Sequence, residues 1–408
     1  NYLAKRIKSL RVITISKKYR KKFSKSVKLI SLESNIWDNF SRRIKYFLSI
    51  LLLINEILKN KNIVVMSFQA NIYCILICKL FSIKVISRSN SAPIGWSQNF
   101  FKKKIFGIGL KLADKIIVNS IEFKRDLKKE FNNISVDNIM SNLRQTKDSQ
   151  EIKLLTKAIK ISTLAQIEVM KAIHGDMTER EVQGIHEFIY RKYGAAHEGY
   201  NSIVGAGANS CILHYITNES IDIDNQLILM DLGAEYRGYT ADVTRTIPAN
   251  GKFSPEQKQI YDLVYESQEA AIKKAIIGNT FNDIYLESIE IISNGLIKLG
   301  IIDDAKDARK YYPHGVSHHI GLDVHDPGSR TLEKNMVITV EPGIYIPQNS
   351  DCDPKWWNIG VRIEDDILIT GTDPINLSKD APRQSNEIEK LMKQESPINQ
   401  LVLPSIDD

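Results

Sequence analysis

The sequence predicts two units of different fold class: a partial α/β domain in the N-terminal third and an α+β domain in the remainder. Between residues 63 and 131, short apolar runs alternate with helical segments, which is typical of a parallel sheet with helical crossovers. After residue 149, helices are segregated from antiparallel hairpins. A chain of 408 residues is long enough for two or three such domains.

The first unit shows strand and helix signals in regular order, followed by an Asn-rich and Ser-containing segment at residues 132–148. We place a domain boundary near Asp137, which gives domains at residues 1–137 and 138–394 and a loose tail at 395–408. The expected strands of the first unit are Ile63–Phe68, Ile83–Ser87 and Lys115–Val118, and its expected helices are Ala70–Phe81, one that ends at Leu110–Ala113, and Glu122–Phe131.

The second unit begins with long amphipathic segments. Thr178 is followed by Glu181 three residues later, which is the signature of a capping box at the start of a helix. A tight turn at Glu235–Gly238 separates two strand-like runs, and Gly295 is expected to break the last helix. The expected helices are Ser149–Ile173, Glu179–Lys192, Pro255–Ala275 and Phe281–Leu299, and the expected strands are Leu227–Met230, Ala241–Ile247, Met336–Ile346 and Ile359–Thr370.

Composition excludes several classes of protein. Apolar residues make up 43% and charged residues 25%, close to the average of globular domains, which argues against disordered and fibrous chains. No run of 18 or more apolar residues occurs, so no bilayer span is expected. The four cysteines show no CxxC spacing, and we interpret them as reduced residues of a cytoplasmic protein.

Charge is divided unevenly between the two units. Residues 1–145 hold 29 Lys and Arg against 8 Asp and Glu, a net charge of +21, whereas the other 263 residues hold 26 against 40, a net charge of −14. A basic unit suits an anionic membrane surface or a nucleic acid, or is simply a lysine-rich surface. We expect weak membrane-surface contact and no nucleic acid. An acidic unit often holds cations.

Two aspartates stand on either side of the tight turn. A two-residue loop that pivots between Tyr236 and Arg237 would place Asp231, in the apolar run LILMDLG, directly opposite Asp242. Carboxylates that face each other across a hairpin repel unless a proton or a cation lies between them. The alternative is an exposed hairpin face with ordinary aspartates.

Two glutamates repeat this arrangement. Glu341 in ITVEPGIYI and Glu364 in GVRIEDD are equidistant from the centre of the polar loop at 347–358, so antiparallel pairing across that loop would bring them together. Alternation places Arg362 on the same face as Glu364, where its guanidinium can bind a carboxylate or a substrate terminus.

Histidines complete the set of candidate ligands. Four of the eight histidines fall within HGVSHHIGLDVHD, and His214 follows a glycine-rich segment. Four carboxylates and one imidazole balance two divalent cations, and oxygen ligands with one nitrogen favour Mn, Co, Zn or Mg. Two such ions can lower the pKa of a shared water and present hydroxide to a carbonyl, so the pattern predicts hydrolysis.

Residues from about 142 to 392 resemble the pita-bread metallopeptidases of the aminopeptidase P and prolidase branch. The segments that carry the resemblance follow one another in order: YNSIVGAGANSCILHY, MDLGAEYRGYTADVTRT, HGVSHHIGLDVHD, ITVEPGIYI and GVRIEDD. The resemblance implies a pita-bread α+β domain with a dinuclear site, most often Mn, with Co or Zn as alternatives. The implied metal ligands are Asp231, Asp242, His318, Glu341 and Glu364.

The same resemblance implies the other roles. Glu341 would help to deprotonate the water that bridges the ions, His214 and His325 would orient the peptide and stabilise the oxyanion, and His314 and Arg362 would line the proline-side pocket. The implied reaction is hydrolysis of an N-terminal Xaa-Pro bond by the metal-bridging hydroxide. The implied partners are peptides with proline at the second position, and a homo-oligomer is compatible with the family.

The basic unit resembles another family. Residues 63–132, with IVVMSFQAN, IKVISRSNSAP and LKLADKIIVNS, are similar to a truncated Rossmann-like acceptor-side domain of a two-domain glycosyltransferase. The nucleotide-sugar domain does not follow, so we expect no glycosyl transfer. The junction is either a real fusion or two joined reading frames. The alternatives to an active peptidase are a glycosyltransferase-like fragment fused to an impaired peptidase domain, and a pita-bread module that only binds.

Overall fold

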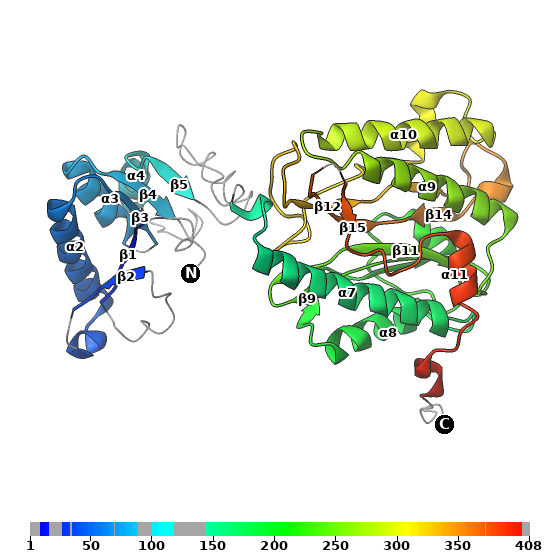
Figure 1. Cartoon of the computed structure of the whole chain (residues 1–408), viewed down its shortest axis with the longest axis horizontal. Coiled ribbons are helices and arrows are strands. Elements are labelled where there is room, and N and C mark those ends of the chain that lie inside the picture. The colour runs from blue at the N-terminus through cyan, green and yellow to red at the C-terminus, as the bar shows by residue number, and fades with distance from the viewer. Residues whose placement is uncertain are drawn as a thin grey trace. The chain divides into compact units, whose positions relative to one another are not determined.

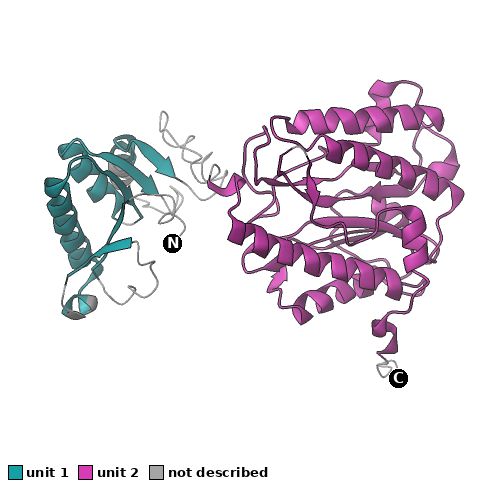
Figure 2. Cartoon of the chain, viewed as in Figure 1, with its two compact units in different colours: residues 1–140 teal, residues 141–408 magenta. Residues whose placement is uncertain are grey.

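The computed structural model describes residues 9–15, 27–32, 35–68, 70–88, 100–117, 143–371 and 373–401. The chain divides into two compact units, residues 1–140 and 141–408 (Figure 2). The expected boundary at Asp137, the expected helix Glu122–Phe131 and the end of the tail beyond residue 401 lie outside the described residues. Within the tail, η7 (Pro397–Gln400) forms a short 3-10 helix.

Unit 1 contains the parallel sheet that the sequence predicts. Strands β3 (Val64–Ser67), β4 (Lys84–Arg88) and β5 (Lys115–Ile117) pair in this order, and both pairs are parallel. Each crossover contains a helix, α3 (Asn71–Leu80) or α4 (Phe100–Lys111), as parallel pairing requires. The remaining elements are α2 (Arg42–Lys59), a 3-10 helix η2 (Asn35–Asn39), and the parallel pair β1 (Leu10–Ile13) and β2 (Val27–Ile30).

Unit 2 is built on two helix pairs. Helices α7 (Ser149–Ala172) and α8 (Glu179–Lys192) pack together, as do α9 (Pro255–Lys273) and α10 (Phe281–Lys298). In Figure 1 the strands lie between the two pairs. Each of these helices begins with a reciprocal capping box, so the signal at Thr178 is confirmed and recurs at Asp148, Ser254 and Thr280.

Over the described residues of unit 2, the strands form four small sheets, all antiparallel. One large apolar core joins the helices to these sheets. The sheets are β7 (Ile203–Ala206)–β8 (Leu227–Leu232)–β11 (Val243–Pro248), β6 (His197–Glu198)–β9 (Ala234–Tyr236)–β10 (Tyr239–Thr240), β12 (Val337–Val340)–β15 (Asp365–Leu368)–β16 (Ile375–Asn376), and β13 (Gly343–Ile346)–β14 (Ile359–Arg362).

Short helical segments connect these elements. They are the 3-10 helices η4 (Gly207–Cys211), η5 (Ala305–Lys310) and η6 (Pro354–Trp356) and the α-helix α11 (Ser385–Leu391).

The predicted register of the first hairpin is wrong, because the centre of the turn lies one residue further along the chain than predicted. The turn residues are Arg237 and Gly238, with φ of 54° and 90°, so the pivot lies between these two residues. Two-residue hairpin turns of this type need positive φ at both central residues, and glycine takes that conformation at little cost. Asp231 therefore pairs with Thr244 rather than with Asp242.

The predicted register of the second hairpin is confirmed. Gly343 pairs with Arg362 on one side of the glutamates and Val340 pairs with Asp365 on the other. The same register carried across the interruption places Glu341 opposite Glu364. The two strands expected here are each split in two at these glutamates.

The expected break at Gly295 is also wrong, because α10 runs through it. A Cβ atom at this position would lie 2.3 Å from Cδ1 of Leu263 in α9. The glycine therefore permits close contact between two helices rather than ending one.

Among the described residues, none of the helices combines the length and the apolar character that a membrane span requires.

This contact predicts opposite effects for the same substitution in two helices. Gly295→Ala should lower the free energy of unfolding by about 1 kcal/mol, because the methyl group overpacks against the buried Leu263. In Gly184→Ala, the added Cβ in α8 has no neighbouring atom within 4 Å. This substitution should raise the free energy of unfolding by about 0.5 kcal/mol, because alanine has a higher helix propensity than glycine. Urea titration of the full chain measures both, and equal effects would contradict the packing argument.

Candidate metal centre

The predicted ligands come from five separate places in unit 2. Asp231 lies in β8, whereas Asp242 stands between β10 and β11, Glu341 between β12 and β13, and Glu364 between β14 and β15. His318 precedes β12, and its backbone N–H donates to Thr339 Oγ1 at 3.2 Å, which ties it to that strand. Three of the four carboxylates thus stand where a strand ladder is interrupted.

The structure brings three of these side chains to one point around His318. Its Nε2 atom lies 3.4 Å from Asp242 Oδ2, 3.5 Å from Glu341 Oε1 and 4.0 Å from Glu364 Oε1. One donor atom each of Asp242, His318 and Glu364 lies within 4.8 Å of the other two, a spacing that could hold a metal ion.

Asp231 joins the cluster through Tyr200. The Tyr200 hydroxyl lies 2.6 Å from Asp231 Oδ1 and 2.5 Å from Asp242 Oδ1. A phenol carries a single proton, so it can donate to only one of the two carboxylates at a time. Arg362 Nη2 donates to the other oxygen of Asp231, Oδ2, at 2.5 Å. Asp231 is therefore held between a phenol on one oxygen and a guanidinium on the other.

Glu364 provides a test of whether these residues fit a metal. Its Oε2 atom accepts a hydrogen bond of 2.6 Å from Thr244 Oγ1. Its Oε1 atom, which faces His318, is buried and has no hydrogen-bond partner among the described residues. A buried carboxylate oxygen without a partner is costly, and a cation would supply the missing interaction. The carboxylate-rich donor set and this open oxygen fit a hard divalent ion.

The acid–base properties of the cluster show the repulsion between its carboxylates. Burial, together with the neighbouring acids, raises the pKa of Glu341 to about 7 and the pKa of Glu364 well above its usual value. Burial also raises the pKa of Asp231. For His318, burial lowers the pKa, but Asp242 and Glu341 outweigh it and raise the pKa to about 9. The cluster therefore attracts positive charge.

Asp242 behaves differently from the other carboxylates. Although burial raises its pKa, the hydrogen bond and the charge of His318 more than compensate, and the net pKa is lowered. Asp242 is thus the carboxylate that stays ionised beside the imidazolium.

A second group lies beside the cluster and contains the predicted proline-side residues. His314 Nδ1 lies 2.8 Å from the Gly315 carbonyl oxygen, and its Nε2 lies 2.8 Å from the Tyr345 hydroxyl. Because burial lowers the pKa of His314 to about 4, the ring is neutral; Nδ1 donates to Gly315 and Nε2 accepts from Tyr345. Arg362 Nη1 donates to the same hydroxyl at 2.9 Å.

The remaining two histidines lie at the exposed side of the site. The ring centroid of His325 is 4.4 Å from that of His318, at an interplanar angle of 86°. His214 is exposed. Burial lowers the pKa of His314 and of His325 most; the charge of Arg362 lowers that of His314 further, the charge of His318 lowers that of His325 further, and His214 adds a smaller effect to both. His214 therefore lies near both rings, although the structure shows no direct contact between them.

Sequence reasoning missed four residues of the site. Tyr200 and Tyr345 lie within the segments used for the resemblance, and Thr244 and Asp366 each stand two residues after a predicted ligand. Asp366 Oδ2 accepts the backbone N–H of Asp242 at 3.1 Å, which fixes the position of that ligand. Strand alternation could have found Thr244 and Asp366, whereas nothing in the local pattern indicates that Tyr200 reaches two aspartates.

Comparison with known proteins points to one family. Residues 153–371 match metallopeptidase family M24. The Xaa-Pro aminopeptidase of Escherichia coli (strain K12) is 40% identical over 267 residues, which cover 62% of this chain and 60% of the relative. The chain thus spans about three fifths of the length of this curated relative.

Solved structures of aminopeptidase P agree with this match. The E. coli enzyme with the inhibitor Pro-Leu is 36% identical, with a TM-score of 0.63, over 70% of this chain and 72% of that chain. The zinc-substituted E. coli enzyme in complex with product is 34% identical, with a TM-score of 0.64, over 75% of this chain and 70% of that chain.

The raised pKa values predict that the metal-free protein loses stability as the pH rises. The folded-state pKa values of Glu341 and His318, about 7 and about 9, lie above their ordinary values of 4.5 and 6.5. The stabilisation of the fold by the protonated forms of these two groups is complete at low pH, and it is lost as the pH rises through their folded-state pKa values. In EDTA, the melting temperature should therefore fall between pH 6 and pH 8.5, by on the order of 5 °C.

Divalent metal should reverse this trend, because metal replaces the protons that leave. The stabilisation by added Mn²⁺, measured by differential scanning calorimetry, should be larger at pH 8.5 than at pH 6. Stabilisation that is equal at the two pH values would contradict competition between protons and metal for these side chains.

Proposed function

The chain belongs to metallopeptidase family M24, and on this premise we propose that it is a metal-dependent exopeptidase that removes an N-terminal residue preceding proline. The observation that supports the proposal most directly is the convergence of buried carboxylates on His318, with an open oxygen of Glu364. The similarity of unit 2 to aminopeptidase P structures, which have the α+β pita-bread architecture, supports it further. We assign residues 138–394 to the catalytic domain.

The donor set fits two divalent ions. The proposed ligands are Asp231, Asp242, His318, Glu341 and Glu364. Two ions at this site would act as Lewis acids and lower the pKa of a water molecule towards neutrality. Oxygen-rich ligation favours Mn²⁺, with Co²⁺ or Zn²⁺ as alternatives, and the zinc-substituted relative is an example of exchange.

Proton transfer is assigned to Glu341. Glu341 is the least buried of the four carboxylates, so it can exchange a proton with water at the open side of the site. Its Oε1 atom lies 3.5 Å from His318 Nε2, and its Oε2 atom lies 3.9 Å from His314 Nδ1. Glu341 thus stands between the metal cluster and the proposed proline-side group.

The other side chains are proposed to position the peptide. An Xaa-Pro bond has no N–H, so the site must hold it through its carbonyl oxygens and the proline ring. Burial lowers the pKa of His325, so its neutral ring can donate an N–H to an oxyanion, and exposed His214 can orient the scissile carbonyl. His314 and Arg362, joined through Tyr345, would line the proline side.

The proposed ligand role predicts the effect of Asp242→Asn. The amide removes one negative charge from the cluster, so the variant should bind fewer than two ions per chain. Hydrolysis of an Ala-Pro-headed peptide should fall by at least about 10³-fold. Metal content is measured by inductively coupled plasma mass spectrometry and turnover by release of alanine.

Two further variants make this test specific. Asp323→Asn changes a carboxylate whose side chain is 65% exposed and should preserve both metal content and turnover. His325→Ala should preserve the two ions but lower kcat by on the order of 10²-fold, since it removes only a donor. Full turnover by Asp242→Asn would exclude the ligand role, and metal loss in His325→Ala would contradict the separation of roles.

The cysteines and unit 1 support further proposals about location and partners. Cys78, Cys211 and Cys352 form no disulfide bond, which supports the proposed cytoplasmic location. The parallel sheet of unit 1 is compatible with the proposed likeness of residues 63–132 to a glycosyltransferase acceptor-side domain. We propose no nucleic-acid partner, and sedimentation equilibrium would test the proposed homo-oligomer.

Weak contact of unit 1 with an anionic membrane surface is supported by α2. Phe47, Leu51 and Leu58 are 63%, 47% and 63% exposed and follow helical spacing, which places them on one face. Basic residues flank this apolar stripe at both ends, including Arg42 and Lys59. An apolar face with basic flanks and a net charge of +21 over residues 1–145 complements anionic lipid headgroups.

This contact predicts sedimentation with vesicles that contain phosphatidylglycerol, but not with phosphatidylcholine vesicles. Phe47→Ser should reduce the bound fraction several-fold, because the aromatic ring that would insert into the membrane surface is removed. The control is Phe188→Ser, which removes a similarly exposed phenylalanine from α8 of unit 2 and should change nothing. Equal sedimentation with both kinds of vesicle, or with neither, would exclude the contact.

A further inference from the structure

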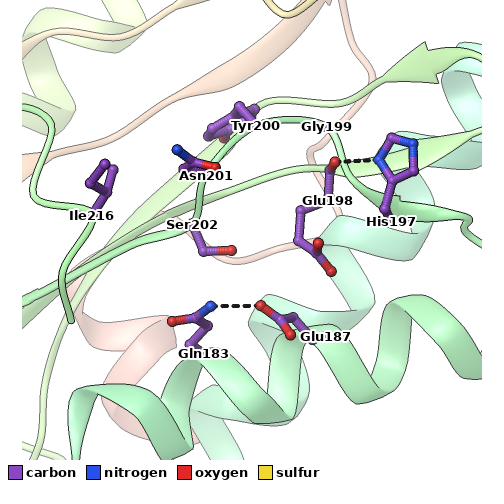
Figure 3. A pocket seen from close by; sticks show the side chains of 9 residues that line it. All are labelled: Gln183, Glu187, His197, Glu198, Gly199, Tyr200, Asn201, Ser202 and Ile216. Carbon is purple, nitrogen blue, oxygen red and sulfur yellow. Dashed lines mark hydrogen bonds between the residues drawn. The ribbon is translucent and has the colours of Figure 1, made fainter. Parts of the chain in front are cut away.

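A cavity of about 520 Å³ opens between α8 and the segment that contains Tyr200. Figure 3 shows its lining, with Gln183 and Glu187 on α8 and Glu198 and Ser202 on the facing segment. None of the metal-binding, catalytic or substrate-binding residues predicted from the sequence lines this cavity. We call it the Glu187–Glu198 pocket.

The pocket contains a buried polar group without a partner. Ser202 is 5% exposed, and its Oγ atom has no hydrogen-bond partner among the described residues. In Figure 3 this hydroxyl points into the space bounded by Gln183, Glu187 and Glu198. Because buried hydroxyl groups are normally paired, an unpaired one directed into a cavity indicates the place of a ligand atom.

The charges of the pocket favour a cationic ligand. Glu187 accepts a hydrogen bond of 2.7 Å from Gln183 Nε2 through Oε1, and Glu198 Oε1 accepts one of 2.9 Å from Arg191. The structure shows no hydrogen bond to the second oxygen of either carboxylate within the described ranges. Since Arg191 balances only one of the two charges, the pocket keeps negative charge and offers three acceptors, two carboxylate oxygens and Ser202 Oγ.

Tyr200 connects the pocket to the metal centre. It lines the pocket, and its hydroxyl contacts Oδ1 of Asp231, whereas Arg362 occupies Oδ2 of the same carboxylate. Tyr200 and Arg362 thus approach Asp231 through different oxygens. Under the proposed function, a peptide whose terminal ammonium approaches Asp231 and Asp242 would have its first residue next to Tyr200.

We propose that the Glu187–Glu198 pocket selects peptides whose first residue is lysine or arginine. An ammonium group has three N–H donors, which match the three acceptors of the pocket. This inference rests on the proposed Xaa-Pro exopeptidase function and adds the class of side chain that the site prefers before proline.

Kinetics with matched substrates test the selection. Peptides that begin with Lys-Pro, norleucine-Pro and Ala-Pro, followed by the same residues, are compared by kcat/KM. The Lys-Pro peptide should exceed the norleucine-Pro peptide by about tenfold, which corresponds to about 1.4 kcal/mol. Glu187→Gln, which keeps the shape of the side chain, should remove this preference through KM and leave the Ala-Pro peptide unchanged.

A control variant excludes a general charge effect. Glu219 is 65% exposed at its side chain and lies 3.9 Å from Arg180, outside the pocket. Glu219→Gln makes the same charge change and should keep the preference for lysine. Loss of the preference in both variants would show that the charge of the surface, rather than this pocket, is responsible.

A binding measurement separates the two proposals. Calorimetry with lysinamide and norleucinamide on the metal-loaded full chain should show tighter binding of lysinamide, lost in Glu187→Gln. If no peptide is cleaved but lysinamide is preferred, the exopeptidase function fails and the pocket stands as a cation site. If the Ala-Pro peptide is cleaved and neither method favours lysine over norleucine, the pocket assignment is overturned.

Discussion

The dominant constraint in unit 2 is electrostatic. Three carboxylates gather around the imidazole of His318, a fourth joins them through Tyr200, and three of the four are buried. Such groups repel in a medium of low polarity, and the fold tolerates them only with compensating charge. His318 beside Asp242 and Arg362 against Asp231 supply part of it. The open Oε1 of Glu364 shows where compensation is incomplete. Affinity for divalent cations follows from this deficit.

The sheets hold these groups through interruptions of their ladders. Residues outside a ladder are free of strict alternation, so Asp242, Glu341 and Glu364 can turn towards a common point. Their neighbours then fix them: Thr244 binds Glu364, and Asp366 accepts the backbone N–H of Asp242. The interruptions are thus part of the site.

Much of the fold and of the candidate site could be predicted because the signals are local. Capping residues set the helix starts, and the centre of the polar loop sets the register of Glu341 and Glu364. The predicted register of the first hairpin is wrong because the turn residues are Arg237 and Gly238, one position further along the chain than the sequence pattern indicates. The predicted helix break at Gly295 is wrong because the glycine serves a tertiary contact with Leu263, which no local pattern reveals. Tyr200 was missed for the same reason, since its partners are 31 and 42 residues away.

The hydrogen bonds around His314 have a consequence for the kind of ligand it can face. Gly315 fixes the proton on Nδ1, and the Tyr345 hydroxyl satisfies Nε2, so the ring has neither a vacant lone pair nor a spare proton. A partner that approached with an amide hydrogen would find no acceptor on this imidazole. The nitrogen of an Xaa-Pro bond carries no hydrogen, so proline forgoes no hydrogen bond when it lies against an imidazole whose two nitrogens are already paired.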